Sequence, residues 1–156
     1  MDKEKLGELI IASQESMYRV AKSLLRSDAD CADAIQEAVV KAFAGLHSLK
    51  NERYAKTWLT RILINECYAI MRQRKRLVPL EDISEQADSA APDYSPLYRA
   101  VSELPEDMRL AVTLCYAEGY SIREIAQIEH TTESAIKNRL LRARARLREA
   151  LEEEDI

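Results

Sequence analysis

Apolar residues recur at helical spacing through the first half of the chain. One stripe has separations of three, four or seven residues and consists of Leu6, Ile10, Met17, Val20 and Leu24. Such spacing places all five on one side of a single amphipathic helix. With only three Gly and four Pro among 156 residues, the chain also has few of the turn residues that a sheet needs. The pattern therefore predicts an all-α fold.

A second apolar stripe predicts a further helix with a largely acidic opposite side. The stripe consists of Ile35, Val39, Ala42 and Leu46. The positions that should then point outward are Asp30, Asp33, Gln36, Glu37, Val40 and Lys41. Carboxylates near a helix start are favoured by the helix dipole, so capping explains Asp30 and Asp33 in part. An exposed aliphatic residue within an acidic strip indicates a partner contact, and ordinary helix surface is the alternative.

Residues 54–76 predict a third helix that carries cations and aromatic rings on one side. Its apolar side consists of Leu59, Leu63, Cys67 and Ile70. The other side, with Trp58 at its margin, consists of Arg61, Asn65, Tyr68, Arg72, Lys75 and Arg76. Cations hold phosphates, rings stack on unpaired bases and an amide can hydrogen-bond a base edge, so this face suits single-stranded nucleic acid. Half-buried packing is the alternative for Trp58 and Tyr68, and Glu66 falls toward the apolar side without an evident partner.

Residues 77–96 separate the two halves by composition. This stretch carries five acidic and no basic side chains, and three of the four prolines. Basic residues gather instead at Arg72–Arg76 and Lys137–Arg148, although the whole chain has a net charge of -4. We therefore expect two small helical domains, at 1–76 and 97–156, joined by a flexible acidic linker at 77–96.

The second half has the helix-capping and turn residues expected of a helix-turn-helix. Gly119 suits a C-terminal cap, and Ser121-Ile122-Arg123-Glu124 is a capping box that starts a short helix. After a polar turn, Thr132 can cap a last helix, whose apolar side consists of Ile136, Leu140, Ala143 and Leu147. The outward side consists of Ser134, Lys137, Asn138, Leu141, Ala145 and Arg148, flanked by Arg142 and Arg144. This layout is typical of a motif whose second helix enters the DNA major groove, and an ordinary helical hairpin with a basic end is the alternative.

Neither catalytic nor metal chemistry is indicated. The sequence has no phosphate-cradling Gly loop and no paired nucleophile and base, and its three cysteines, Cys31, Cys67 and Cys115, lie far apart and are expected to fill core space. His47 has no companion at ligand spacing. We therefore expect no enzyme activity, metal or cofactor. The absence of a bilayer-length apolar run and of a signal peptide predicts a cytoplasmic protein without membrane insertion.

In their order along the chain, these segments resemble the extracytoplasmic-function sigma factors of bacterial RNA polymerase, over nearly the whole sequence. The segment Asp30–Glu37, followed by Lys41-Ala42-Phe43, is similar to the part of the family that docks on the polymerase clamp helices. Trp58–Asn65, running into Arg72–Arg76, looks like the part that melts and reads the -10 element. The segments that resemble the domain reading the -35 element are Leu104-Pro105-Glu106, Ser121–Ala126 and Ala135–Arg148.

The resemblance implies a promoter-specificity subunit whose partners are core RNA polymerase, promoter DNA and an anti-sigma factor. Polymerase contacts would come from Asp30, Asp33, Gln36, Glu37, Val40 and Lys41. Contacts to the -10 element, with an unpaired base beside the amide, would come from Trp58, Arg61, Asn65, Tyr68, Arg72, Lys75 and Arg76. Contacts to the -35 element would come from Ser134, Lys137, Asn138, Leu141, Arg142 and Arg144.

The turn of the motif departs from the family pattern. His130 stands where Gly usually adopts a left-handed conformation, which His tolerates better than most residues. Glu129 and Thr131 replace the usual apolar residues beside it, which predicts a looser or differently packed turn. The leading alternative function is an autonomous helix-turn-helix regulator, which would bind a palindromic duplex unaided as a dimer. A nucleic-acid-modifying enzyme is disfavoured because the catalytic groups are missing.

Overall fold

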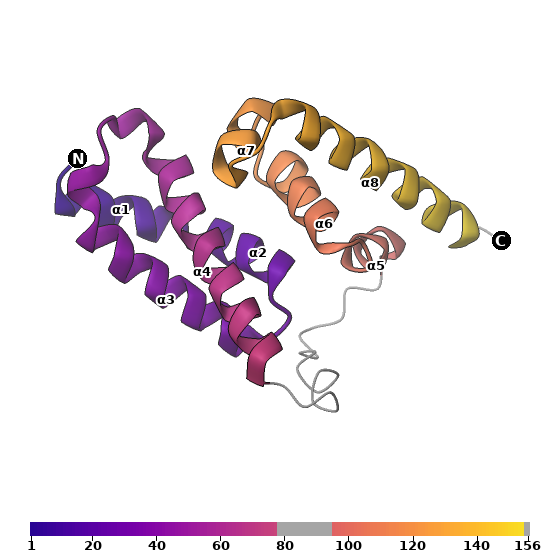
Figure 1. The fold of residues 1–156 in the computed structure, drawn as a ribbon, viewed down its shortest axis with the longest axis horizontal. Coiled ribbons are helices and arrows are strands. Elements are labelled where there is room, and N and C mark those ends of the chain that lie inside the picture. The colour runs from indigo at the N-terminus through magenta and orange to yellow at the C-terminus, as the bar shows by residue number, and fades with distance from the viewer. Residues whose placement is uncertain (78–94, 155–156) are drawn as a thin grey trace. The chain divides into compact units, whose positions relative to one another are not determined.

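The computed structural model describes residues 1–77 and 95–154, and each regular element within these ranges is a helix (Figure 1). The chain divides into two compact units, Met1–Asp88 and Ser89–Ile156. The expected all-α fold is therefore confirmed. Of the predicted linker at 77–96, residues 78–94 lie outside the described residues.

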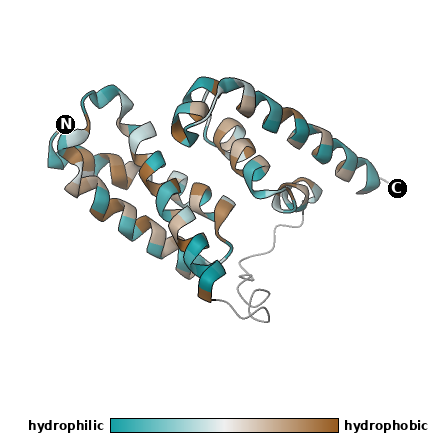
Figure 2. Cartoon of the chain, viewed as in Figure 1, coloured by the Kyte–Doolittle hydropathy of each residue, from teal (hydrophilic) through white to brown (hydrophobic). Residues whose placement is uncertain are grey.

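Within residues 1–77, the first unit has four α-helices: α1 (Lys3–Ala12), α2 (Gln14–Leu24), α3 (Asp28–Ala44) and α4 (Ala55–Leu77). Two single 3-10 turns, Leu46–Ser48 and Glu52–Tyr54, connect α3 to α4. Helix α3 packs along α4, and α2 contacts both. Among the side chains that this packing buries completely are Leu59 and Leu63, each of which stabilises the unit by about 1.5 to 3 kcal/mol. Figure 2 shows that hydrophobic and hydrophilic residues share each of these helices, as expected of helices with one buried side.

The first apolar stripe belongs to two helices rather than the predicted single one. Helix α1 ends at Ala12 and α2 begins at Gln14, with Ser13 buried at the joint. The Ser13 amide still donates to the carbonyl groups of Leu9 and Ile10, at 2.9 and 3.1 Å, so the backbone remains hydrogen-bonded where its direction changes. A gap of seven residues in the stripe conceals such a break, because two full turns separate the apolar positions on either side of it.

The buried side of α3 agrees with the predicted one at Ala42 and lies one position away from it at Ile35 and Val39. Its completely buried residues are Cys31, Ala34, Ala38 and Ala42, whereas Ile35 and Val39 are only half-buried. Small side chains allow two helix axes to approach closely, so α3 presents this column to its neighbours and leaves the larger residues at the margin.

The second unit consists of α5 (Pro96–Ser102), α6 (Glu106–Val112), α7 (Ile122–Glu129) and α8 (Glu133–Glu154). A π-helical turn, Thr113–Ala117, extends α6. Helix α8 packs against α5, α6 and α7, and buries Ile136, Leu140 and Ala143. The predicted capping box is present: the Glu124 amide donates to Ser121 Oγ at 3.1 Å, and the Ser121 amide donates to Glu124 Oε1 at 2.9 Å.

The turn between α7 and α8 has the predicted left-handed residue. His130 has φ 56° and ψ 47°, and it is the one non-glycine residue with positive φ in the described parts of the chain. The Thr131 amide donates to the Ala126 carbonyl at 2.9 Å, which closes the end of α7. Thr132 then caps α8, because its Oγ1 accepts from the Ala135 amide at 3.1 Å. The second unit thus contains a helix-turn-helix made of α7 and α8.

Candidate nucleic-acid interface

The outward side of α8 is largely polar and basic. The residues predicted to face DNA are all exposed in the structure: Ser134, Lys137, Asn138, Leu141, Arg142 and Arg144. Leu141 is 65% exposed, so the surface also includes one apolar side chain. Because α8 follows α7 across a tight turn, this surface occupies the position of a recognition helix.

An ion pair holds α8 against α7, and sequence reasoning missed it. Arg139 Nη1 donates to Glu129 Oε2 at 3.3 Å, and Arg139 Nε lies 3.8 Å from Asp107 Oδ2 of α6. The Glu129 side chain is only 7% exposed. Glu129, the last residue of α7, is therefore buried and paired with a cation of α8.

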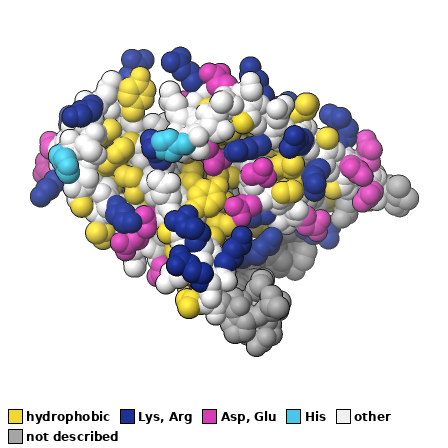
Figure 3. Space-filling view, in the orientation of Figure 1, with side chains coloured by type: hydrophobic (Ala, Val, Ile, Leu, Met, Phe, Trp, Pro, Cys, Tyr) yellow, Lys and Arg dark blue, Asp and Glu magenta, His cyan; other side chains and the backbone are white. Residues whose placement is uncertain are grey.

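Helix α4 exposes its amide and its terminal cations. Asn65, Arg72, Lys75 and Arg76 are exposed, whereas Trp58, Arg61 and Tyr68 are half-buried. An open groove of about 450 Å³ lies at the end of the helix and is lined by Ala69, Arg72, Gln73, Arg76 and Leu77. Figure 3 shows Lys and Arg side chains gathered over the last turns of α4. The face has cations along one end and partly accessible rings nearer its start.

Asp30 does not face outward, and that prediction was wrong. The residue is 8% exposed, and its carboxylate accepts two hydrogen bonds from Arg74 of α4: from Nη2 at 2.6 Å and from Nε at 3.1 Å. The one-position shift of the buried column is the physical reason, because it turns residue 30 toward α4. The hydrogen bond that Arg74 donates to Asp30 also raises the pKa of Arg74. Arg74 is thereby committed to a contact within the unit.

Glu66 finds its partner on α3. Lys41 Nζ donates to Glu66 Oε2 at 2.7 Å, with the Glu66 side chain 11% exposed and the Lys41 side chain 54% exposed. This contact explains a carboxylate on the apolar side of α4. The hydrogen bond to Glu66 raises the pKa of Lys41. The rest of the predicted α3 strip is exposed as expected, namely Asp33, Gln36, Glu37 and Val40.

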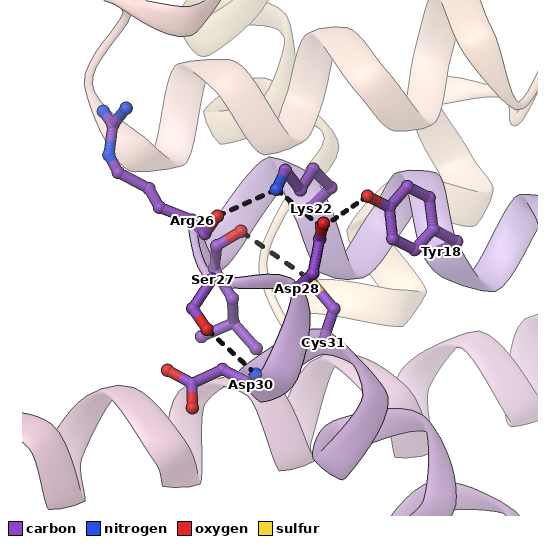
Figure 4. Close-up of polar contacts among 8 residues, drawn as sticks. Tyr18, Lys22, Arg26, Ser27, Asp28, Asp30 and Cys31 are labelled. Atoms are coloured by element: carbon purple, nitrogen blue, oxygen red, sulfur yellow. Dashed lines mark hydrogen bonds and ion pairs between the residues drawn. The ribbon is translucent and has the colours of Figure 1, made fainter. Parts of the chain in front are cut away.

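A polar cluster fixes the junction between α2 and α3 (Figure 4). Asp28 Oδ1 accepts from Tyr18 Oη at 2.6 Å and from Lys22 Nζ at 2.8 Å, and Lys22 also donates to the Arg26 carbonyl. The hydrogen bond to Asp28 raises the pKa of Tyr18. The Ser27 side chain caps α3 by accepting from the Asp30 amide at 3.3 Å. These contacts set the direction in which α3 leaves the junction.

The described residues offer little for metal or thiol chemistry. Within 1–77 and 95–154, no group of three or more His, Cys, Asp or Glu side chains could hold a metal ion. Cys31 and Cys67 are buried, Cys115 is half-buried, and burial raises the pKa of Cys67 to about 12. No helix in these ranges has both the length and the apolar character that a membrane span requires.

Two helical units, one of them a helix-turn-helix with an exposed basic recognition helix, define a DNA-binding protein. Comparison with known families gives two matches: Sigma-70 region 2 over residues 9–77, and Sigma-70 region 4 over residues 94–147. The ECF RNA polymerase sigma factor SigM of Mycobacterium tuberculosis is 33% identical over 150 residues, covering 94% of this chain and 76% of that protein. The sigma factor SigV of Bacillus subtilis is 27% identical over 159 residues, covering 99% of this chain and 95% of that protein.

A solved structure agrees with these sequence matches. The sigma factor RpoE of Bartonella quintana, solved with the anti-sigma factor NepR, matches with a TM-score of 0.79 and 28% identity over 96% of this chain and 98% of that one. The chain belongs to the extracytoplasmic-function (ECF) family of RNA polymerase sigma factors. It directs core RNA polymerase to specific promoters and initiates transcription. These matches support a sigma factor and not an autonomous regulator.

Proposed function

We propose that the two units of the chain recognise different elements of the promoter. Residues 1–76 bind polymerase and open the -10 element, residues 97–156 read the -35 element, and residues 77–96 join them. The observation that carries this proposal is that each unit exposes one basic and polar helix face, on α4 and on α8. The order of the two family matches along the chain supports the same assignment.

The polymerase-facing surface is the exposed side of α3. It consists of Asp33, Gln36, Glu37 and Val40, with Lys41 at its margin. Val40 is 60% exposed between carboxylates, so the strip offers an apolar contact within a charged rim, the usual composition of a protein interface. Asp30 is excluded from this surface because Arg74 covers it.

The -10 surface lies on α4. Arg72, Lys75 and Arg76 bind phosphates, Asn65 hydrogen-bonds an unpaired base, and Trp58, Arg61 and Tyr68 border that base. A stacked base contributes about 1 to 3 kcal/mol. Extruding a base from the duplex costs roughly a few kcal/mol, so capture on α4 can offset opening without ATP.

The -35 surface lies on α8. Ser134, Lys137, Asn138 and Leu141 stand nearest the base edges, and Arg142 and Arg144 bind phosphates or a guanine. Losing a bidentate base contact typically costs about 1 to 3 kcal/mol, which is enough to define preference at one position.

Regulation and location follow from the family. The similar RpoE structure contains an anti-sigma factor, and we infer that an anti-sigma factor also restrains this chain. The protein works beside polymerase in the cytoplasm and is not itself a catalyst, because bond formation belongs to the polymerase.

Reconstituted transcription tests the proposal. The pure chain is mixed with core RNA polymerase and a library of duplexes with randomised promoter sequence, and transcripts are sequenced. We expect one promoter class with two short preferred elements, and little duplex binding by the chain alone. Tight binding to a palindromic duplex in the absence of polymerase would contradict the proposal and favour a dimeric regulator.

A further inference from the structure

Two ion pairs join α3 to α4, and three of their four residues lie outside the proposed binding surfaces. The Asp30 carboxylate, near the start of α3, binds Arg74 near the end of α4. The Lys41 ammonium, near the end of α3, binds Glu66 in the middle of α4. Residue numbers rise along α3 as they fall along α4, so the helices are antiparallel. The contact between them is fixed at two points.

Both carboxylates are shielded from water, whereas their cations are only half covered. Asp30 and Glu66 have side chains that are 11% exposed, against 45% for Arg74 and 54% for Lys41. An unpaired carboxylate at such burial is costly, so each must keep its cation. The Asp30–Arg74 contact is also a two-bond fork, which fixes orientation as well as distance.

The residues next to these pairs form the two binding faces. Arg74 lies within the basic end of α4, between Arg72 and Lys75, and Glu66 directly follows Asn65. On α3, residues 30 and 41 bracket the exposed strip that includes Asp33 and Val40. One residue of helix corresponds to 100° of rotation and about 1.5 Å of rise, so a small slip of α4 on α3 would carry the whole -10 face away from its place beside the polymerase surface.

We propose that Asp30 and Glu66 are positioning residues: by holding Arg74 and Lys41, they fix the register of α4 on α3 and thereby the place of the -10 face. This inference rests on the function proposed above for the two faces. It assigns no DNA contact to Arg74 and no polymerase contact to Asp30.

A double-mutant cycle in the reconstituted holoenzyme tests the first pair. The variants are Asp30→Asn, Arg74→Gln and the two combined, each as the full chain with core RNA polymerase. The probes are a promoter selected by the wild-type holoenzyme and the same promoter with one base changed in its -10 element. Four quantities are measured. They are the affinity for core polymerase, the permanganate reactivity of the promoter, the ratio of opening on the two promoters (the -10 ratio), and the salt dependence of promoter binding.

We expect each single variant to lose about three- to tenfold in opening and in the -10 ratio, because one charge-assisted contact is lost. The combined variant should lose no more than either single one, since both remove the same interaction. Core affinity should stay within about twofold of wild type. The matched control is Lys5→Gln, which removes an exposed ion pair of the same unit, 3.4 Å from Glu52, and should change none of these quantities.

Three results would overturn the inference. A loss confined to Arg74→Gln, with the salt slope reduced by about one, would make Arg74 a phosphate contact. A loss of core affinity confined to Asp30→Asn would return Asp30 to the polymerase interface. An unchanged -10 ratio with a lower unfolding temperature would leave the pair a packing role, because a smaller active fraction does not alter a ratio. Failure of the wild-type chain to select any promoter would instead overturn the proposed function, and this inference with it.

The Lys41–Glu66 pair allows an independent test of the proposal. Glu66→Gln should lower the -10 ratio, and the exchanged pair Lys41→Glu with Glu66→Lys should recover it to within about threefold of wild type, because the interhelix attraction is restored. An exchanged pair as impaired as Glu66→Gln, with the affinity for core polymerase unchanged, would show that the contact does not act through position.

Discussion

Single residues on α8 differ in what they can recognise. Asn138 carries a donor and an acceptor suited to a base edge, whereas Arg144 carries a charge on a flank of the helix, and both are exposed. We expect Asn138→Ala to change the preferred -35 sequence with little effect on the salt slope, which is the slope of the logarithm of the promoter-binding constant against the logarithm of salt concentration. Arg144→Ala should reduce the magnitude of that slope by about one without changing the preferred sequence. Selection from a randomised -35 library at several salt concentrations measures both. Identical preferences from Asn138→Ala and wild type would exclude that residue from base reading.

On α4, the exposed amide of Asn65 has a different proposed role from the cations, because it can hydrogen-bond a base. We expect Asn65→Ala to reduce promoter opening by roughly fivefold to 100-fold, as for loss of a base contact worth about 1 to 3 kcal/mol, with little change in initial association. Permanganate reactivity and core affinity separate the two steps. An exposed amide on α2, Gln14, gives the control variant Gln14→Ala. Equal reactivity of wild type and Asn65→Ala would remove this role.

At the scale of elements, the exposed side of α3 makes a prediction about assembly. Asp33→Lys with Glu37→Lys should weaken core polymerase binding by about tenfold or more, because reversed charges meet the same partner surface. Helix content should not change, as both side chains are exposed. The control reverses exposed carboxylates of α1 and α2, Glu8→Lys with Glu15→Lys. Undiminished binding in a competition assay would exclude the strip from the interface.

The junction of α7 with α8 predicts a stability difference. Glu129→Gln leaves Arg139 without its buried partner and should lower the free energy of unfolding by about 1 to 3 kcal/mol. Replacing both partners, Glu129→Leu with Arg139→Met, should recover most of that loss, because apolar packing often equals a buried ion pair. Urea unfolding of the full chain measures each change. A double variant less stable than Glu129→Gln would show that the turn needs its charges.

These elements also show what sequence reasoning can reach. The capping box at Ser121 was predictable because it is signalled within four residues of sequence, whereas the left-handed His130 was predicted from the resemblance, since the family usually has Gly there. The buried side of α3 was not fully predictable. Alanines and a cysteine form it, whereas the larger apolar residues Ile35 and Val39 indicated a different side of the helix. Asp30 was misplaced for that reason. Arg74 and Arg139 were missed because their partners lie on other helices, and the only local signal was a cation beside an apolar stripe.

For the whole molecule, the two proposed DNA-reading faces belong to separate units of one chain, so we expect their binding energies to combine through covalent linkage. Lengthening residues 77–96 by about ten Gly and Ser residues should cost only about 0.4 kcal/mol in closure entropy. We therefore expect transcription to persist while the tolerated spacing between the two promoter elements widens. Sequencing of transcripts from a spacing library measures this. An unchanged narrow spacing would mean that the polymerase, and not this segment, sets the distance.

The unequal burial of the three thiols has a practical consequence. Cys31 and Cys67 are enclosed between helices, whereas Cys115 is half-buried in the π-helical turn that extends α6. A maleimide dye applied to the native protein should thus attach at Cys115 alone, and the chain needs no engineering to carry one fluorophore in its helix-turn-helix unit. Energy transfer from that position to labelled DNA would follow docking of the unit on a promoter in real time.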